Sequence, residues 1–537
     1  MKAGMKRTVN ERSEEKRYET FPKEPSKMKK IFSVIAILSL VFSPVTPAFA
    51  ATASWTGGDP LNSDWTDGDN WSATPVPTLG DTATFNAAAG AGGAIIDLGG
   101  AGVTSISNIV FDTANAAAYT IGVAGVDDLT IDDGGDITVN ASVANTQTIA
   151  ADIIMNNSAN FTNNATASTT LLNITGDVTS LGAVIAEFFT LDGSNTGDNT
   201  VSGDIDDGIA GIKVRKNGTG TWVLSGTNTY DGATTVNAGT LKLGSAGALG
   251  TVVGGTTVAS GATLDLNGQT IVLAEALTLN GTGVGGGGAL LNSAAGAASY
   301  AGAITLASAS TITSTGAGGL TLSGGIDNGG FDLTFDGVSD TTVDTVKITG
   351  AGGIIKNCTG ELSLDFANDY TGTTTINAGT VVLGDAAGLG GVAGGTVVAA
   401  GAALDLDGQT VGAEALTLNG TGVAGSGALY DSTGGAVYNG MITLGSASTI
   451  TSTGAGNMLT LSGGITNAGF TTTFDGAGDT TVDTVAIAGT GGVTKNGAGT
   501  LTLGVSNTYT GTTTINAGTV DLTAADALAD TGAVVLA

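Results

Sequence analysis

A long internal period constrains this chain more than any other feature of its sequence. The segment 218–244 reads GTGTWVLSGTNTYDGATTVNAGTLKLG, and closely related segments return at 358–384 and 497–523. One tyrosine is shared by the three copies and sets their spacing at 140 and then 139 residues, namely Tyr230, Tyr370 and Tyr509. Repeats of a fixed period form arrays in which neighbouring units bury a core that no single unit could bury alone. The period therefore predicts a stacked repeat array.

Comparison of the three copies separates inward from outward positions. Between two large apolar positions the residue is Lys242, Val382 or Asp521, and a lysine, a valine and an aspartate can share a position only where water reaches it. Alternation with a period of two is typical of strands that bury one face. We therefore predict an all-β chain in which Lys242 and Asp521 face solvent. Ten apolar side chains are expected to point into one continuous core, namely Leu224, Val236, Leu241, Leu243, Leu364, Ile376, Leu383, Leu503, Ile515 and Leu522.

The first 50 residues differ from the rest. Residues 1–27 hold eight Lys or Arg and five Glu without an apolar period, which indicates a disordered extension or a start codon assigned too early. The segment 28–50 contains two lysines, then the apolar run 31–42, and ends in small residues, as a secretory signal peptide does. That run is shorter than the roughly 20 residues that a membrane-spanning helix needs. We expect cleavage before Ala51 and export of the chain.

Charge and cysteine content limit the partners. Five of the 47 acidic and ten of the 17 basic residues lie in the first 50, so the remainder carries 42 acidic and seven basic residues, a net charge of −35. Such a surface repels nucleic acid and anionic membranes, and neither is expected as a partner. The one cysteine, Cys358, has no second cysteine for an internal disulfide, so we expect stability to come from stacking.

Composition divides the exported part into segments. Tryptophan and proline gather near its start, and no proline follows Pro77, which fits ladder hydrogen bonding that a missing N–H would break. The predicted segments are a Trp- and Pro-rich cap at 51–85, an irregular β-solenoid at 86–210, long repeats at 211–350 and 351–489, and a partial copy at 490–537. The cap is expected to cover the first coil, as terminal units of solenoids do.

The pattern GTGTxxLSGxNTYxGxTTVNAGTLxLG resembles the autotransporter-associated β-strand repeat, also called the passenger-associated transport repeat. The opening SWTGGDPLNSDWTDGDNWS is similar to the start of many large exported proteins with such repeats. The resemblance implies a right-handed parallel β-helix passenger, displayed at the cell surface or released, with an outer-membrane translocator as partner. At about 20 to 24 residues per coil and about 4.8 Å between coils, it would form roughly 20 rungs. No residue after Tyr509 is aromatic, whereas translocator barrels carry aromatic girdles, so we expect no translocator within this chain.

Residues suited to catalysis are sparse. The chain has no histidine, and Arg215 is the one arginine after residue 50, so the commonest general base and metal ligand is missing. A polysaccharide lyase on the same fold would need a basic proton acceptor beside its carboxylates. Two acidic groups resemble glycosidase pairs but have turn composition, namely Asp132, Asp133 and Asp136, and Asp204, Asp206 and Asp207. We predict no catalytic residue, no cofactor and no metal site.

One acidic segment near the N-terminus suggests a calcium loop. It contains Asp64, Asp67, Asp69 and Asn70. The spacing lacks the glutamate of an EF-hand and the nonapeptide of calcium-binding β-helices. A solvated turn is the favoured interpretation.

Three polar positions recur in every copy and are interpreted as structural. A lysine followed by asparagine is assigned to a rung turn, at Lys216, Lys356 and Lys495. An asparagine before Ala-Gly is predicted to adopt left-handed φ and to bond to nearby backbone, at Asn237, Asn377 and Asn516. The shared tyrosine, if exposed, could stack on a sugar. Packing at a rung corner is favoured, because the copies lie roughly six rungs, or about 30 Å, apart.

Two functions from different classes remain at this stage. The first is an exported, non-catalytic structural or adhesive stalk, placed at the cell surface or outer membrane or released, or in the periplasm if no translocator acts. Its partner would be a cell-surface or extracellular ligand, with carbohydrate as one class. The alternative is a carbohydrate-active enzyme on a β-helix. The missing histidine and the regular repeats favour the first, although fold does not settle function.

Overall fold

The computed structural model describes residues 51–59, 62–88, 94–99, 103–181, 187–209, 211–528 and 532–537. The extension predicted at 1–27 and the signal peptide predicted at 28–50 lie outside these described residues. Within them no helix has the length and apolar character needed to cross a membrane. Helical structure in the described part consists of three short 3-10 turns, which are η1 (Gly68–Asn70), η2 (Val284–Gly286) and η3 (Val423–Gly425).

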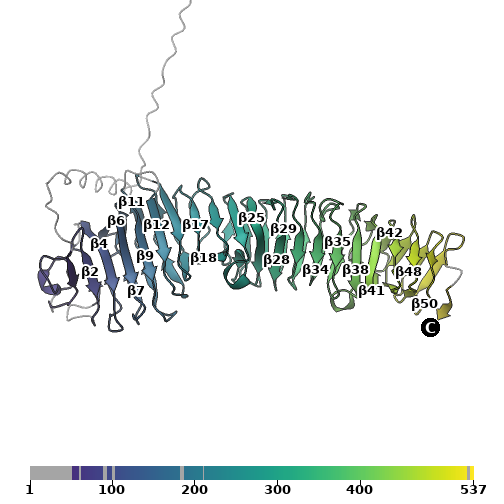
Figure 1. Cartoon of the computed structure of the whole chain (residues 1–537), viewed down its shortest axis with the longest axis horizontal. Helices are drawn as coiled ribbons and strands as arrows, with labels where there is room; N and C mark the ends of the chain where they lie inside the picture. Colours follow the sequence, from purple (N-terminus) through teal and green to yellow (C-terminus); the bar gives the residue numbers. More distant parts are fainter. Residues whose placement is uncertain are drawn as a thin grey trace, which may run out of the picture. The chain divides into compact units, whose positions relative to one another are not determined.

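Parallel strands account for nearly all other regular structure. They stack as a β-solenoid of about 19 turns, which confirms the predicted all-β parallel β-helix. Figure 1 shows the strands side by side from β2 (Thr82–Phe85) to β50 (Thr513–Ile515). The ladder is continuous through the region without the strong period, where β9 (Ala159–Asn163) pairs with β12 (Glu187–Asp192) and β12 pairs with β15 (Ile212–Lys216).

Each complete coil runs through three faces. One coil contains β19 (Thr256–Val258), β20 (Ala262–Asp265) and β21 (Thr270–Ile271), and then β22 (Leu277–Gly281) pairs with β19. Thr256 pairs with Leu277, so this coil takes 21 residues. The strands are short because Gly, Asn and Asp interrupt the β-branched residues that suit a pleated surface.

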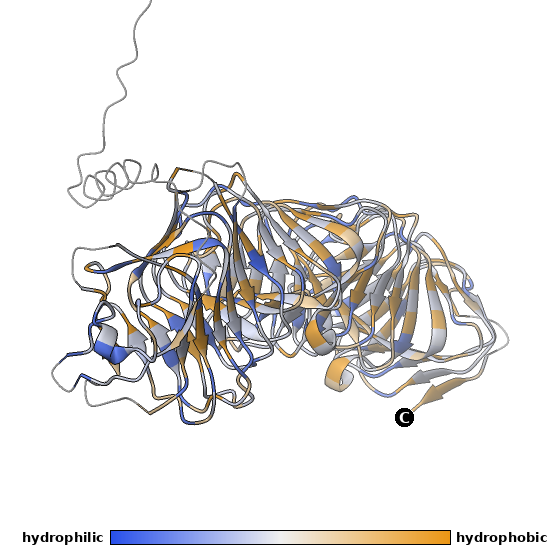
Figure 2. Cartoon of the chain, turned by 60° about the vertical axis from the view of Figure 1, so that its left-hand side comes forward, coloured by the Kyte–Doolittle hydropathy of each residue, from blue (hydrophilic) through white to orange (hydrophobic). Residues whose placement is uncertain are grey.

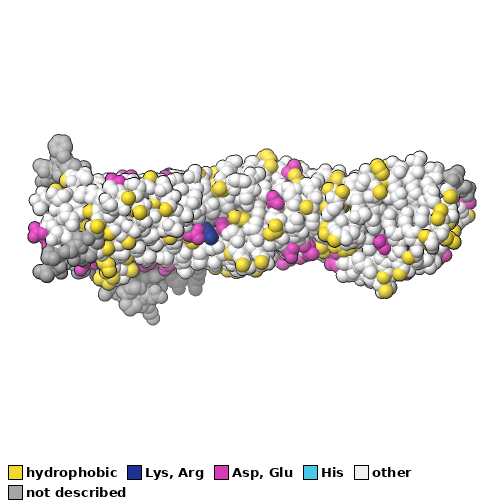
Figure 3. Space-filling model, turned by 90° about the horizontal axis from the view of Figure 1, so that it is seen from below, with side chains coloured by type: hydrophobic (Ala, Val, Ile, Leu, Met, Phe, Trp, Pro, Cys, Tyr) yellow, Lys and Arg dark blue, Asp and Glu magenta, His cyan; other side chains and the backbone are white. Residues whose placement is uncertain are grey.

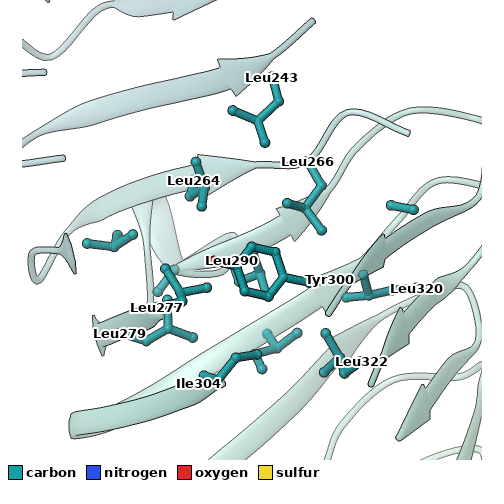
Figure 4. Packing of buried hydrophobic residues seen from close by; sticks show 14 of the residues in the cluster. Leu243, Leu264, Leu266, Leu277, Leu279, Leu290, Tyr300, Ile304, Leu320 and Leu322 are labelled. Carbon is teal, nitrogen blue, oxygen red and sulfur yellow. The ribbon is translucent and has the colours of Figure 1, made fainter. Parts of the chain in front are cut away.

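Inward side chains of successive coils form one core. Figure 4 shows leucine, isoleucine and tyrosine side chains of neighbouring coils gathered in the interior. Figure 2 shows apolar residues recurring along the strands of the solenoid. Eight of the ten predicted core residues are fully buried, namely Leu224, Val236, Leu241, Leu243, Leu364, Ile376, Leu383 and Leu503.

The other two predicted core residues correct the prediction. Ile515 is half-buried, and Leu522 is 45% exposed. Leu522 lies on β51 (Thr519–Leu522), which pairs with a strand on one side only. A solenoid side chain is buried by the coils on both sides of it, and the last described coil has a neighbour on one side. The local pattern was right, but its position in the stack decided exposure.

The two residues predicted to face solvent do so. Asp521 is exposed. The Lys242 side chain keeps 22% of its surface exposed, and its Nζ lies 3.2 Å from Asp198 Oδ2 in an ion pair. The outward direction assigned to both residues is confirmed.

An aromatic cluster fills the interior of the first coils. The rings of Trp55 and Trp65 each lie against Trp71, with centroids 5.1 Å and 4.7 Å apart. Phe85 continues the cluster toward the next coil. Trp65 Nε1 donates to the Pro77 carbonyl at 3.1 Å. The tryptophans of the segment predicted as a cap therefore supply apolar area where a solenoid would otherwise begin open.

Equivalent strands of the three copies lie on different faces. Six successive pairings lead from β16 (Thr221–Leu224) to β31 (Ile354–Lys356), whereas the equivalent of β16 is β32 (Glu361–Leu364), the next strand in the chain. The third equivalent, β48 (Thr500–Leu503), belongs to the separate six-stranded sheet. One long repeat therefore advances six coils and one further face. Outer side chains at equivalent positions point in three different directions.

Truncation of an inward leucine tests the stacked core. Leu383→Ala should lower the free energy of unfolding by about 2 to 5 kcal/mol, because the cavity is closed in by coils on both sides. Lys242→Ala is the control, and loss of its exposed ion pair should cost about 0 to 1 kcal/mol. Urea unfolding followed by circular dichroism measures both. A loss at Lys242 as large as that at Leu383 would contradict the assigned faces.

Candidate functional site

Each copy of the repeat buries a lysine at the end of a strand. Lys216 ends β15, Lys356 ends β31, and Lys495 ends β47 (Val493–Lys495). Their exposed fractions are 0%, 0% and 2%. A charge taken out of water needs strong compensation. These lysines are the most unusual residues that the copies share, and we take the repeat coil around them as the candidate site.

Backbone carbonyls provide that compensation. Lys356 Nζ donates to the carbonyls of Cys358 at 2.7 Å, Gly360 at 2.5 Å and Ala378 at 3.0 Å. The first two lie in the turn after the strand, and Ala378 belongs to the Asn-Ala-Gly turn of the following coil. The ammonium group therefore holds two coils together.

Lys216 repeats this arrangement, and Lys495 repeats the contact with its own turn. Lys216 Nζ donates to the Gly218 carbonyl and, at 3.0 Å, to that of Ala238. Lys495 Nζ donates to the Gly497 carbonyl. Burial lowers the pKa of Lys216 to about 8, and Asp192 acts in the opposite direction. Burial also lowers the pKa of Lys495. The carbonyl dipoles favour the charged form, which suits an ammonium donor.

The sequence placed these lysines at a turn but did not predict their burial. The signal was available in the strand, where Ile212, Val214 and Lys216 alternate with outward residues. A lysine in phase with two core residues points inward. Its partners come from the next coil, and the local pattern does not show them.

The asparagine before Ala-Gly is exposed and does not adopt the predicted backbone. Positive φ falls two residues later, at 64° for Gly239. A Cβ there would lie 2.3 Å from the Gly220 carbonyl oxygen, so the turn requires glycine. The prediction of left-handed φ was therefore wrong. Each side-chain amide instead donates to an asparagine one coil earlier, in the pairs Asn237–Asn217 at 2.8 Å, Asn377–Asn357 at 2.8 Å and Asn516–Asn496 at 2.7 Å.

A second asparagine, which the sequence analysis missed, bridges three coils. Asn368 Oδ1 accepts from the Ile348 N–H at 2.7 Å, and Asn368 Nδ2 donates to the Gly388 carbonyl at 2.7 Å. These partners lie 20 residues before and 20 residues after it. Asn228 and Asn507 occupy the same position in the other copies and make equivalent bonds. The shared N-x-Y sequence was the available signal.

The shared tyrosine is an interior residue. Each ring is fully buried, and each hydroxyl bonds to a threonine hydroxyl, in the pairs Tyr230–Thr234 at 2.7 Å, Tyr370–Thr374 at 2.6 Å and Tyr509–Thr513 at 2.7 Å. Burial raises the pKa of all three phenols. Packing at a rung corner is confirmed. Sugar stacking on these rings is wrong, because no face of the ring is accessible.

The suggested calcium loop is a hydrogen-bonded turn. Asp64 Oδ1 accepts from the backbone N–H and the hydroxyl of Thr66, at 2.8 and 2.7 Å. Asp67 caps η1 and accepts from the Asp69 N–H at 3.0 Å, and this bond is the main cause of its lowered pKa. Asn70 is buried and donates to the Asp64 carbonyl at 3.1 Å. Its residues thus serve the turn, as the favoured interpretation holds.

The first group suggested as a glycosidase pair lies in a strand. Asp132, Asp133 and Asp136 belong to β6 (Asp128–Val139), so the predicted turn was wrong. The first part of β6 pairs with β8 (Asp152–Met155) and the last part with β9, so the acidic segment forms the corner between two ladders. Asp136 Oδ1 accepts from Asn160 Nδ2 at 2.7 Å.

The second acidic group ties neighbouring coils together. Asp204 Oδ1 accepts from the Thr227 N–H at 2.7 Å, and Asp207 accepts from the N–H groups of Ile212 and Asp231, at 2.8 and 2.9 Å. Asp206 ends β14 (Ile205–Asp206) and accepts from the Thr229 hydroxyl. Apart from the Ile212 N–H, which lies five residues from Asp207, the donors to these carboxylates lie one coil away.

The basic residues before the first repeat lie against an aromatic ring. Arg215 Cζ is 3.6 Å from the centroid of the Phe188 ring, and Lys213 Nζ is 5.8 Å from it. Lys213 and Phe188 are ladder partners on β15 and β12. The outward basic groups are thus used in cation–π contacts on the solenoid surface.

Two buried glutamates are further residues that the sequence analysis did not single out. Glu275 and Glu414 hold equivalent positions in the two long repeats, and each is 2% exposed. Each carboxyl group contacts a threonine hydroxyl at 2.6 Å, Thr256 in the first repeat and Thr396 in the second. Burial raises the pKa of both glutamates to about 7. They therefore titrate near neutral pH in the folded chain.

Known proteins match part of the chain. A family model described as the passenger-associated-transport-repeat matches residues 214–243, 355–383 and 493–522. A curated relative named Adhesin BmaC autotransporter, from Brucella suis biovar 1 (strain 1330), is 36% identical over 170 residues. That alignment covers 31% of this chain and 4% of the relative, so the chain spans a small part of the relative's length. No solved structure matches.

Each buried lysine Nζ and the backbone carbonyls that accept from it are here called a lysine cage. Removal of a buried lysine amine tests this cage. Lys216→Met keeps the apolar stem but leaves the Gly218 and Ala238 carbonyls without their donor. We expect a loss in the free energy of unfolding of about 1 to 3 kcal/mol per carbonyl. Urea unfolding measures it, with Lys242→Met as the exposed control. Unchanged or higher stability of Lys216→Met would show that the cage does not hold the coils.

The buried glutamates predict a pH dependence. Their folded pKa of about 7 lies above the ordinary glutamate pKa of 4.5, so their stabilising contribution is complete below about pH 4.5 and is lost as pH rises through about 7. The shift corresponds to about 3 kcal/mol per group. The urea midpoint should therefore fall between about pH 5 and about pH 7.5.

Replacement of both glutamates provides the matched control. A Glu275→Gln and Glu414→Gln double variant should lose most of this pH dependence, because glutamine keeps a hydrogen-bonding group at the threonine hydroxyl and does not ionise. Burial raises the pKa of Glu187 as well, so a smaller slope of the same sign should remain. A double variant with the slope of the parent protein would refute the assignment.

Proposed function

We propose that this chain, which carries three passenger-associated transport repeats, is an exported, non-catalytic passenger that acts as a structural or adhesive stalk. The observation that carries the proposal is that the repeated residues are interior ones. In each copy the lysine, the N-x-Y asparagine and the tyrosine are buried, and the asparagine bonds to the coils on both sides of it. The repeat thus supplies a scaffold rather than a repeated active site.

Export and surface placement rest on the N-terminal segment and on the charge. Residues 28–50 have the three parts of a signal peptide. Figure 3 shows one face of the solenoid, where acidic side chains are scattered along the surface and basic ones are sparse. Such a surface favours solubility outside the cell and disfavours nucleic acid as a partner. The stalk would lie at the cell surface or outer membrane, or be released.

The chemistry of the chain supports a non-catalytic role. It has no histidine, and members of both acidic groups considered above accept hydrogen bonds that tie coils together. An enzyme needs a base poised near its working pH beside the reacting group. Glu275 and Glu414 have suitable pKa values but are buried against threonines in the interior, away from any substrate.

Adhesion is the finer part of the proposal. The curated relative is named an adhesin, and a stalk that presents a surface outside the cell suits a cell-surface or extracellular ligand, with carbohydrate as one class. Equivalent outer positions point in three directions, so a ligand on one side meets the outer surface of one copy at a time. We therefore place the adhesive surface in the outward residues that differ between copies. An outer-membrane translocator is the expected partner for display.

A display experiment tests the function. Residues 1–537 fused to a translocator barrel in a Gram-negative host should appear on the cell surface, and the cells should bind immobilised glycans or matrix proteins more than cells with the barrel alone. Protease accessibility on intact cells measures display. Plate binding measures adhesion.

A parallel assay tests the non-catalytic role. Purified residues 51–537 should show no turnover of polygalacturonate, xylan or peptides, with or without calcium. A rate that disappears when one Asp group is replaced, but not the other, would overturn the proposal in favour of a carbohydrate-active enzyme.

A further inference from the structure

The chain's one cysteine lies inside the second lysine cage. Cys358 and Lys356 are 1% and 0% exposed, and Lys356 Nζ lies 3.0 Å from Cys358 Sγ. The other two copies carry Gly218 and Gly497 at the position of Cys358. Their lysines therefore have carbonyl partners and no thiol. The second copy thus pairs an amine with a thiol where its equivalents have an amine alone.

The local backbone brings these two groups together. The residues are two apart at the end of β31, so both side chains point to the same side, into the interior. Asn357 and Thr359, which flank Cys358, are both exposed. The pair therefore lies beneath a turn whose flanking side chains contact water, and a small molecule must enter through that turn to reach Sγ. The carbonyls around Nζ hold the amine in place against the sulfur.

We propose that Lys356 and Cys358 form a reversible nitrogen–sulfur crosslink when the protein meets a peroxide. The thiol first reacts with hydrogen peroxide to give a sulfenic acid and one water molecule. Lys356 Nζ, which donates to three carbonyls, first releases one proton to solvent and gives up one of these bonds. The resulting amine attacks Sγ, the S–O bond breaks, and the hydroxyl group leaves as a second water molecule with a proton from the nitrogen. The sulfur is oxidised, the peroxide is reduced, and the product is an S–N bond.

The surroundings of Cys358 favour an S–N bond over a disulfide or a more highly oxidised sulfur. A disulfide needs a second thiol, and the chain has one cysteine. Over-oxidation of the sulfenic acid needs a second peroxide molecule at a buried sulfur, whereas the amine is already in contact. A thiol reductant would cleave the S–N bond and restore both groups. The inference does not depend on the adhesive role, because it concerns the coil interior alone.

Mass spectrometry of residues 51–537 tests the proposal. After treatment with a small excess of hydrogen peroxide, the protein should lose about 2 Da, and the peptide with Lys356 and Cys358 should carry the loss. Cys358 should then resist alkylation under denaturing conditions, and a thiol reductant should restore both mass and alkylation. The reaction should be faster at higher pH, because the attacking amine must be unprotonated.

Two variants serve as controls. Cys358→Gly recreates the residue of the other copies, so it should fold and show no mass loss. Lys356→Arg keeps a cation and donors in the cage, but its guanidinium stays protonated, so peroxide should add about 16 or 32 Da at Cys358 instead. The proposal is overturned if the parent protein gains these masses, keeps an alkylatable thiol, or retains an oxygen atom between the linked residues.

Discussion

Parallel hydrogen bonding from coil to coil is the constraint on which the rest of this structure depends. It places each inward residue above the inward residue of the preceding coil, so apolar positions add into one core. It also means that a polar group turned inward must find its partner in the turn beside it or one coil away. Lys356 reaches the carbonyl of Ala378, and Asn368 bonds to Ile348 and Gly388, for this reason.

The length of the long repeat separates the scaffold from the surface. Six coils and one further face make up one unit, so β16, β32 and β48 share a sequence but lie in different ladders. Their buried residues meet the same environment, because all three faces close on one interior. Their outer residues point in different directions. Duplication of such a unit lengthens the solenoid, but the outer surfaces of the copies do not line up on one side, so their outer residues are free to differ.

The buried ionisable groups are compensated in two ways. The lysines donate to between one and three backbone carbonyls each, which suits a charged ammonium group. Glu275 and Glu414 have a threonine hydroxyl as partner, and their raised pKa reflects a preference for the neutral acid. The lysines therefore act as ties between coils, whereas the glutamates make the stack sensitive to pH near neutrality.

The sequence by itself determined the fold class, the approximate number of coils, the interior place of Tyr230 and the inward direction of residues such as Leu383, because these follow from a period of two within a repeated unit. Only the tertiary structure decided which polar residues are interior, where left-handed φ falls, and on which face each copy lies. Coils vary in length, with ladder partners 19 residues apart at Trp222 and Leu241 but 29 apart at Thr270 and Ser299. The alternation of residues within one strand does not show how long a coil is. The partners of a buried lysine or asparagine therefore become known only when the coils are stacked. The same holds for the exposure of Leu522 at the end of the stack.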